Sequence, residues 1–232
     1  MKKKRLAKFL AAAGVASRRA CEQIIFHGRV KVNGKVTLLP QTMVDGSEKI
    51  EVDGQPIDQE ESKAYYLLNK PPGYLCTAMK NRRGKVVLDL FQGVDKRLFT
   101  VGRLDKDTTG LLIITNDGNF ANRIIHPSSC IQKEYVARTG KEISADHLKT
   151  ISAGTEVEGK WIKPLKVKKV RKGTVKVVIG EGKKREVRHL IAAAELDVKE
   201  LKRTRIGGLK LGNLPVGYWR EMTGREKEQI FE

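Results

Sequence analysis

The sequence predicts an α+β protein in which a small helix–helix–hairpin module precedes a larger domain of mixed strands and helices. Three observations support this prediction. Residues 1–57 contain two stretches of helical periodicity followed by strand alternation around an Asn-Gly pair. Residues 58–63 contain no apolar side chain and are expected to form a linker. Residues 64–232 mix short strands with helical segments, without an internal repeat.

Local signals define each element of the small module. The apolar residues of positions 6–13 recur at helical spacing, and Gly14 is suited to end that helix. Ser17 can cap a second helix, which Gly28 ends. The segment VKVNGKV at 30–36 predicts a hairpin, because an Asn-Gly pair accepts the positive φ angles that a tight turn requires.

The larger domain is expected to contain more strands than helices. Strands are predicted at residues 64–69, 97–101, 111–115, 133–139, 166–170, 174–180 and 198–204. Helices are predicted at residues 118–125, 144–152, 185–195 and 223–230. This mixture is typical of an α+β domain.

The charge is large and unevenly distributed. The 232 residues include 46 Lys and Arg against 27 Asp and Glu, a formal net charge of +19. Residues 1–35 hold ten bases and one acid, whereas residues 36–62 hold seven acids and one base, and residues 163–210 hold sixteen bases and five acids. A positive charge of this size favours a polyanionic partner through counterion release. We therefore expect two nucleic-acid contacts, separated by an acidic face that points away from RNA.

Several classes of protein are excluded. No stretch reaches the roughly 18 to 20 apolar residues that span a bilayer, and Lys8 interrupts the N-terminal run that imitates a signal peptide. Cys21, Cys76 and Cys130 are widely spaced and form no C-x-x-C pair, so neither a disulfide framework nor a zinc ribbon is expected. The four histidines show no ligand spacing. We therefore expect a cytoplasmic protein with no membrane contact and no bound metal.

The N-terminal segment has a recognisable order of features. Residues 5–36, RLAKFLAAAGVASRRACEQIIFHGRVKVNGKV, resemble the S4-like RNA-binding module in their sequence of helix, Ser-Arg-Arg, helix, Gly-Arg-Val and Val-Asn-Gly. The resemblance implies binding to structured RNA. Arg18 and Arg19, at the start of the second helix, are then expected to contact phosphates. A solvated basic face without a ligand is the simpler alternative.

Five further segments occur in the order that pseudouridine synthases show. They are YLLNKPPGYLCT (66–77), FTVGRLDKDTTGLLIITNDG (99–118), HPSSCIQKEY (126–135), EGKKREVRHL (181–190) and GYWREMT (217–223). The chain therefore resembles, along its whole length, the bacterial ribosomal-RNA pseudouridine synthases with an S4-like module, the RsuA/RluB-type family. The resemblance implies a mainly antiparallel central sheet with flanking helices, an RNA cleft, and no cofactor.

The resemblance also implies a catalytic group. Asp105 matches the family nucleophile, and a carboxylate can serve in this role when a glycosidic bond is broken and a carbon–carbon bond formed. Attack on the ring, attack on the sugar, and removal of a sugar proton through a glycal are all open. Arg188 matches the arginine that pairs with this aspartate and keeps it ionised. Tyr135 matches the aromatic residue on the flipped uracil, while Asp107 is expected to be a turn residue.

Further residues are expected to bind the substrate. Those in the larger domain are Lys70, Arg103, Lys133 and Arg185, of which Lys70 and Lys133 are expected to act as electrostatic or structural supports. Arg103 matches the residue that fills the gap left by the extracted base, which would offset a flipping cost of a few kcal/mol. The segment departs from the family pattern at Glu186, where Gln is usual, and at His189, where a second base is usual. We expect that Glu186, which is close to Arg188 in the sequence, competes for the charge of Arg188.

The sequence thus predicts an isomerase that converts one uridine of ribosomal RNA to pseudouridine. We favour the large subunit, because the EGKKREVR run resembles the large-subunit members of the family. A small-subunit substrate stays open, as does the choice between free RNA and a ribosome assembly intermediate. The main alternative is a non-catalytic RNA-binding assembly factor. A nucleic-acid hydrolase is disfavoured because the sequence shows neither the expected metal-binding carboxylates nor a credible nucleophile–base pair. The resemblance implies a monomer.

Overall fold

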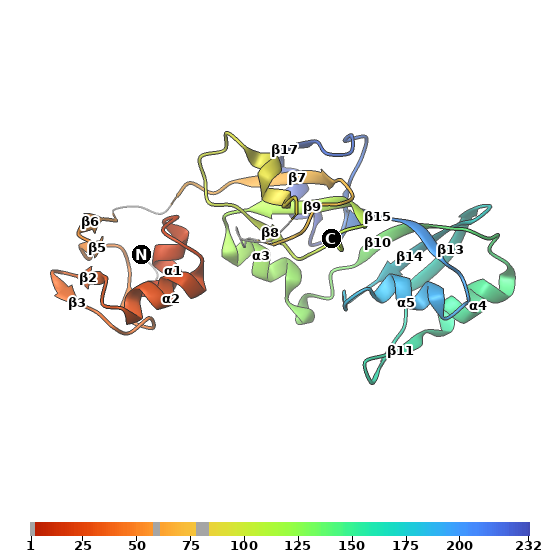
Figure 1. The fold of residues 1–232 in the computed structure, drawn as a ribbon, viewed down its shortest axis with the longest axis horizontal. Coiled ribbons are helices and arrows are strands. Elements are labelled where there is room, and N and C mark those ends of the chain that lie inside the picture. Colours follow the sequence, from red (N-terminus) through yellow and green to blue (C-terminus); the bar gives the residue numbers. More distant parts are fainter. Residues whose placement is uncertain (1–2, 58–60, 78–83) are drawn as a thin grey trace. The chain divides into compact units, whose positions relative to one another are not determined.

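The chain folds into two compact units (Figure 1). The computed structural model describes residues 3–57, 61–77 and 84–232, so residues 58–60 of the expected linker lie outside the described residues. The first unit comprises Met1–Ala64, Val94–Leu98 and Asn116–Gly118. The second unit comprises Tyr65–Gly93, Phe99–Thr115 and Asn119–Glu232.

The first unit has the expected helix–helix–hairpin order. Its helices are α1 (Leu6–Ala12) and α2 (Arg18–Phe26). Its strands are β1 (Lys4–Arg5), β2 (Val30–Val32), β3 (Lys35–Val36), β4 (Met43–Val44), β5 (Ile50–Val52) and β6 (Gln55–Pro56). A four-stranded antiparallel sheet runs in the order β3-β2-β5-β6, and β1 pairs with β4.

Local chemistry explains this unit. The Ser17 side chain accepts a hydrogen bond from the backbone N–H of Ala20 and thereby caps α2. Asn33 and Gly34 both have positive φ, at 50° and 78°, as the two central residues of a tight hairpin turn require. Leu6 and Ile25 are fully buried in the core between the helices and the sheet.

Residue Glu61, within the expected linker, is held in the first unit. Its carboxylate accepts hydrogen bonds from the backbone N–H of Arg97 at 3.2 Å and from Nδ2 of Asn116 at 3.1 Å. Its own backbone N–H donates to the carbonyl of Ala12. The polar side chain of Glu61 therefore links this segment to residues 94–98 and 116–118 of the same unit.

The second unit is built on one nine-stranded sheet. Seven strands follow the order β13-β14-β10-β15-β9-β7-β17, while β16 pairs with β15 and β8 with β9. The β9–β15 pairing is parallel and the other pairings of this sheet are antiparallel, which confirms the expected mainly antiparallel sheet. The strands are β7 (Tyr65–Lys70), β8 (Phe99–Val101), β9 (Thr109–Thr115), β10 (Lys133–Thr139), β13 (Lys166–Arg171), β14 (Thr174–Ile179), β15 (Val198–Ile206), β16 (Leu209–Lys210) and β17 (Trp219–Glu221).

Helices flank this sheet. They are α3 (Gly118–Ile125), α4 (Ala145–Ala153), α5 (Glu186–Ala192) and α6 (Gly224–Gln229), with single 3₁₀ turns at Val87–Phe91 and Pro127–Ser129. A separate hairpin joins β11 (Thr155–Val157) to β12 (Lys160–Ile162). Across the described ranges, no helix has both the length and the apolar character needed to cross a membrane.

One glycine allows the two halves of the sheet to meet. Gly110 pairs with Arg203 where β9 runs parallel to β15, and its φ is 104°. A Cβ atom at this position would lie 2.2 Å from the carbonyl oxygen of Arg203, a distance that no side chain tolerates. The absence of a side chain therefore lets the segment that follows Asp105 lie directly against β15.

Candidate active site

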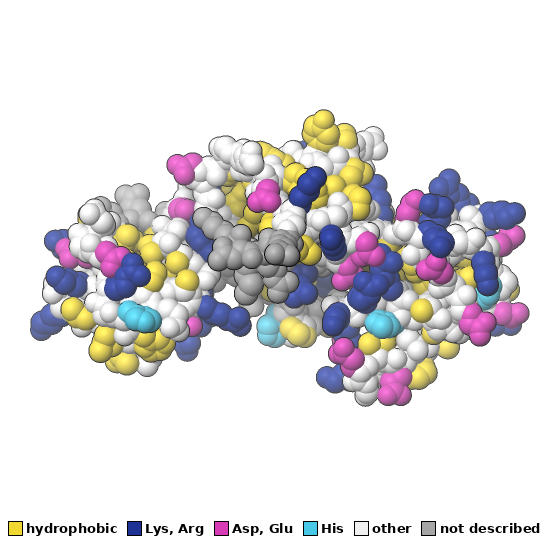
Figure 2. Space-filling view, viewed as in Figure 1, with side chains coloured by type: hydrophobic (Ala, Val, Ile, Leu, Met, Phe, Trp, Pro, Cys, Tyr) yellow, Lys and Arg dark blue, Asp and Glu magenta, His cyan; other side chains and the backbone are white. Residues whose placement is uncertain are grey.

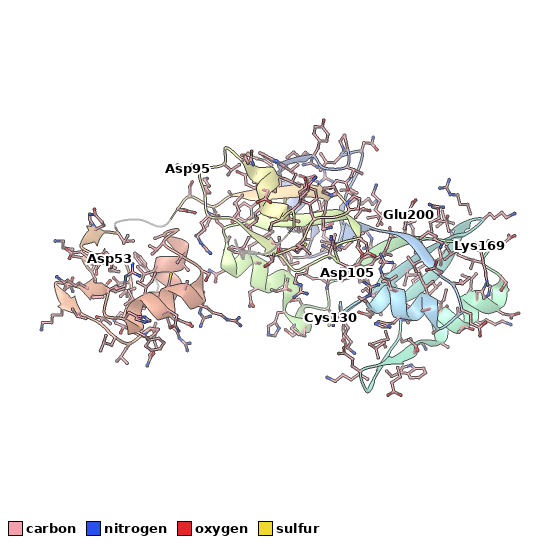
Figure 3. The ribbon with its side chains drawn as sticks, viewed as in Figure 1. Asp53, Asp95, Asp105, Cys130, Lys169 and Glu200 are labelled. Atoms are coloured by element: carbon pink, nitrogen blue, oxygen red, sulfur yellow. The ribbon has the colours of Figure 1, made fainter. Side chains whose placement is uncertain are left out.

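A cavity of about 470 Å³ opens in the second unit, between the loop of residues 102–108, strands β10, β14 and β15, and the start of α5. This volume is within the range of sites that hold small molecules. Figure 3 labels Asp105 in this part of the unit. Five of the residues expected at the site line the cavity: Arg103, Asp105, Lys133, Tyr135 and Arg185. Arg18 and Arg19 belong to the first unit, where both are exposed at the start of α2.

Lys70 supports the loop that carries Asp105. Its side chain is fully buried, and its Nζ donates to the carbonyl oxygens of Pro71 at 3.0 Å, Lys106 at 3.1 Å and Thr108 at 3.0 Å. Burial lowers the pKa of Lys70 below its ordinary value. Lys70 was expected to support the site or to bind substrate, and in the structure its ammonium group fixes the 105–108 loop.

The arginines of the third motif do not pair as expected. Arg188 was expected to pair with Asp105, but its Nη2 lies 2.8 Å from Oδ2 of Asp107. Asp105 is approached instead by Arg185, whose Nη1 lies 3.9 Å from its Oδ2 and 4.0 Å from Oδ1 of Asp107. Asp107 is therefore more than a turn residue. Asp105 and Asp107 belong to the same loop turn, and Arg185 and Arg188 are three residues apart at the start of α5. Each carboxylate therefore lies within 4 Å of an arginine guanidinium.

The start of α5 sets the positions of these arginines. Arg185 precedes the helix with a φ of 53°, in the left-handed region that is unusual for a residue other than glycine. Glu186 is buried, and its carboxylate accepts a hydrogen bond of 2.8 Å from the backbone N–H of Lys183. Burial raises the pKa of Glu186. The Glu186 side chain thus bonds to the backbone of the loop that precedes α5. The expected competition of Glu186 for Arg188 is not observed, because its carboxylate accepts from Lys183 instead.

The floor of the cavity contains a residue, Arg203, that lies outside the sequence motifs. Tyr135 on β10 lies opposite Arg203 on β15, and both are buried. Arg203 donates through Nε to the carbonyl of Leu111 at 2.8 Å, and its Nη1 lies 3.5 Å from the hydroxyl of Tyr135. Its Nη2 is buried without a hydrogen-bond partner among the described residues. A buried cation at an inward-facing strand position was the signal that could have identified it.

Two other titratable groups face the same region. Lys133 is half-buried, its Nζ donates to the carbonyl of Gly180, and burial lowers its pKa. The sulfur of Cys76 accepts a hydrogen bond of 3.4 Å from the backbone N–H of Leu104, and burial raises the pKa of this thiol. Cys76 is therefore held as a neutral thiol.

Within the part of the chain that the structure describes, no group of three His, Cys, Asp or Glu residues is arranged to hold a metal.

The sheet and the cavity together define a class of protein. An Asp-bearing loop, an arginine helix and a buried tyrosine lie on a mainly antiparallel sheet, next in sequence to an S4-like unit. This is the architecture of an RNA pseudouridine synthase. Family models agree: residues 64–193 match RNA pseudouridylate synthase and residues 4–50 match the S4 domain. The chain belongs to the RsuA/RluB family of RNA pseudouridine synthases, which are isomerases.

Individual relatives support this assignment. The ribosomal large subunit pseudouridine synthase B of Bacillus subtilis is 40% identical over 232 residues, covering 97% of this chain and 95% of that protein. A chloroplastic relative from Arabidopsis thaliana is 45% identical over 227 residues, and the chain spans 55% of its length. A solved structure, "Crystal structure of pseudouridylate synthase", has a TM-score of 0.71 and 28% identity, covering 97% of this chain and 99% of that one.

Proposed function

We propose that this protein converts one uridine of large-subunit ribosomal RNA to pseudouridine. The observation that carries the proposal is the cavity itself, where the carboxylate of Asp105 stands at the rim beside Arg185 and Tyr135 forms part of the buried floor. The name of the Bacillus subtilis relative supports the large subunit as the source of the RNA. The EGKKREVR segment favours the same subunit.

The proposed reaction leaves the atom count of the nucleotide unchanged. The uridine is flipped out of its helix into the cavity, at a cost of a few kcal/mol. The bond between N1 and C1′ breaks, the base rotates, and a bond forms between C5 and C1′. C5 then loses its proton, and N1 gains one. Attack on the ring, attack on the sugar, and removal of a sugar proton would each use the carboxylate of Asp105, and Nη1 of Arg185 lies 3.9 Å from its Oδ2.

The floor residues would hold the base. The ring of Tyr135 would pack against the flipped uracil, and its hydroxyl would assist a proton transfer. Arg203 would fix this hydroxyl, since its Nη1 lies 3.5 Å away. A tyrosine held at its ring and at its hydroxyl loses little further freedom when substrate binds.

Residues at the surface would hold the RNA. Arg103 is exposed at the cavity and is proposed to fill the gap that the extracted base leaves. Arg18 and Arg19 are exposed in the first unit and are proposed to contact phosphates, with Arg18 also 3.3 Å from Glu22. Lys133 and Arg185 would add positive charge at the cavity wall.

The experiment is pseudouridine mapping of ribosomal RNA from cells that lack the gene. One large-subunit site should disappear on deletion and return when the wild-type gene is restored. The Asp105→Ala gene should not restore it. A lost site in the small subunit would overturn the choice of subunit. Unchanged modification at every site would favour the non-catalytic assembly factor instead.

A further inference from the structure

The four strands β13, β14, β10 and β15 have a second face, opposite the one that carries Tyr135 and Arg203. On the first face α4 contacts β13 and α5 contacts β15. Successive side chains along a strand point to opposite faces of a sheet. The strand residues that alternate with the cavity-facing residues therefore point to the second face. On this outward face the strands carry many lysines. Figure 2, which shows one side of the molecule, has Lys and Arg side chains interspersed with Asp and Glu around the β13 end of the sheet.

The strand register arranges these cations in two rows. One row runs Lys168, Lys176, Val136 and Lys202, and the next row runs Lys166, Val178, Glu134 and Arg205. Each row crosses three strand spacings, or about 14 Å. A shallow groove of about 460 Å³ follows the second row and includes Lys168 and Lys176. We call these two rows the outward cationic face.

The outward cationic face contains one acid, and that acid is already partnered. The carboxylate of Glu134 accepts a hydrogen bond of 2.9 Å from Thr204, and it lies 3.3 Å from Lys176 and 3.7 Å from Arg205. Burial acts to raise the pKa of Glu134, but the bonds from Thr204 and Lys176 outweigh it and hold the pKa below its ordinary value. Glu134 is therefore an anion whose charge is paired with Lys176 and Arg205.

Three lysines of this face have no such partner. Among the described residues, no carboxylate lies within 4 Å of Lys166, Lys168 or Lys202. Lys168 also lies directly opposite Lys176 on the neighbouring strand. Like charges in directly opposite positions destabilise a sheet.

Protection of a sheet edge explains only part of this pattern. Lysines on an edge strand prevent pairing with other chains, and β13 is such a strand. Lys176 and Lys202, however, lie on β14 and β15, which have strands on both sides. Lysines on these inner strands protect no edge, so they indicate a polyanionic ligand.

We propose that the outward cationic face binds the phosphodiester backbone of the RNA substrate outside the reaction cavity. The inference rests on the proposed function, because it assigns a second contact to the same RNA. Lysines are compact charges that suit phosphates and do not read bases in the bidentate way that arginine does. Binding to this face is therefore expected to be independent of sequence and strongly dependent on salt.

The test compares two double variants that remove equal charge. Lys168→Gln/Lys202→Gln alters the two ends of the first row, whereas Lys149→Gln/Lys160→Gln alters exposed lysines on α4 and β12. Binding is measured as a function of salt with two RNAs: a short hairpin around the modified uridine, and a transcript that extends it with its flanking duplex. The first variant should bind the long transcript about tenfold more weakly, and its salt slope should fall by about 2.

Several outcomes decide the proposal. Affinity and turnover on the short hairpin should stay at the wild-type level in both variants. A Lys168→Arg/Lys202→Arg variant, which keeps the charge, should bind the long transcript like the wild type. Equal salt slopes for the two Gln variants would overturn the proposal, as would a loss of affinity in the Arg variant. Failure of the proposed function is visible separately, because the wild-type protein would then form no pseudouridine in either RNA.

Discussion

The cavity face and the outward cationic face of one sheet differ in how some of their charged side chains are held. On the cavity face, Arg188 is paired with Asp107, and Glu186 is bonded to a backbone N–H. On the outward face, Lys168 and Lys202 have no acidic partner among the described residues. The difference indicates two tasks: fixed side chains suit a reaction that needs exact placement, and unpaired charges suit a flexible polyanion.

The largest effect is expected at the cavity floor. Arg203→Met should lower kcat on the short hairpin about 100-fold, because Tyr135 loses the group that fixes its hydroxyl. KM should change less, and Arg203→Lys should recover part of the rate. Arg205→Met, two residues along the same strand but on the outward face, is the matched control and should keep kcat within about threefold. Equal losses of kcat in Arg203→Met and Arg205→Met would contradict the assignment of the reaction to the cavity face alone.

The Arg188–Asp107 pair is expected to have a smaller effect. Asp107→Asn should lower kcat/KM about tenfold, since Arg188 loses a charged hydrogen-bond partner at 2.8 Å. Arg188→Gln should have a similar effect. The double variant should be no worse than the more damaging single one, because the two side chains act as a unit. Strictly additive losses would show that the ion pair does not serve the reaction.

Glu186 provides a pH-dependent test on the same face. Its pKa is raised by burial above the ordinary value of 4.5, so the folded state disfavours the ionised form. The penalty is absent below about pH 4.5 and grows as the pH rises through the folded-state pKa. Glu186→Gln keeps an acceptor for Lys183 and should raise the free energy of unfolding at pH 7 by less than about 1 kcal/mol. Urea unfolding at pH 4 should show no gain, and a loss of stability confined to pH 7 would contradict this account.

The smallest effect is expected on the outward face. Lys168→Thr should raise the free energy of unfolding by a few tenths of a kcal/mol, because it relieves the opposition to Lys176. Added salt should shrink the gain by screening that opposition. Lys149→Thr on α4 serves as the control and should bring no gain. Destabilisation by Lys168→Thr in thermal unfolding would indicate that the lysine contributes to the fold.

Much of the fold was predictable because its signals are local. Ser17 caps α2, and the Asn33-Gly34 turn adopts the φ angles that its residue types favour. Strands β11, β12, β16 and β17 of the second unit were missed, since two or three residues carry no measurable period. The pairing of β17 also depends on β7, which is distant in sequence. The parallel contact of β9 with β15 joins Gly110 to Arg203, far apart in sequence, which no local pattern encodes.

The site was predictable to the extent that motifs mark it. Asp105 and Tyr135 line one cavity as the resemblance implied. Arg203 lies outside the quoted motifs and was missed, although a charge at an inward strand position was a visible sign. The pairing of Arg188 with Asp107 depends on the left-handed backbone of Arg185 at the start of α5. Periodicity carries no information about that angle.

The most direct test of Asp105 uses a large-subunit RNA transcript labelled with tritium at C5 of uridine. Formation of the bond between C5 and C1′ displaces that hydrogen, so release of tritium into water reports the reaction itself. The purified wild-type protein should release one equivalent of tritium per transcript. Asp105→Asn should release none while binding the RNA with unchanged affinity. Release by Asp105→Asn at the wild-type rate would contradict the central claim that this carboxylate carries the chemistry.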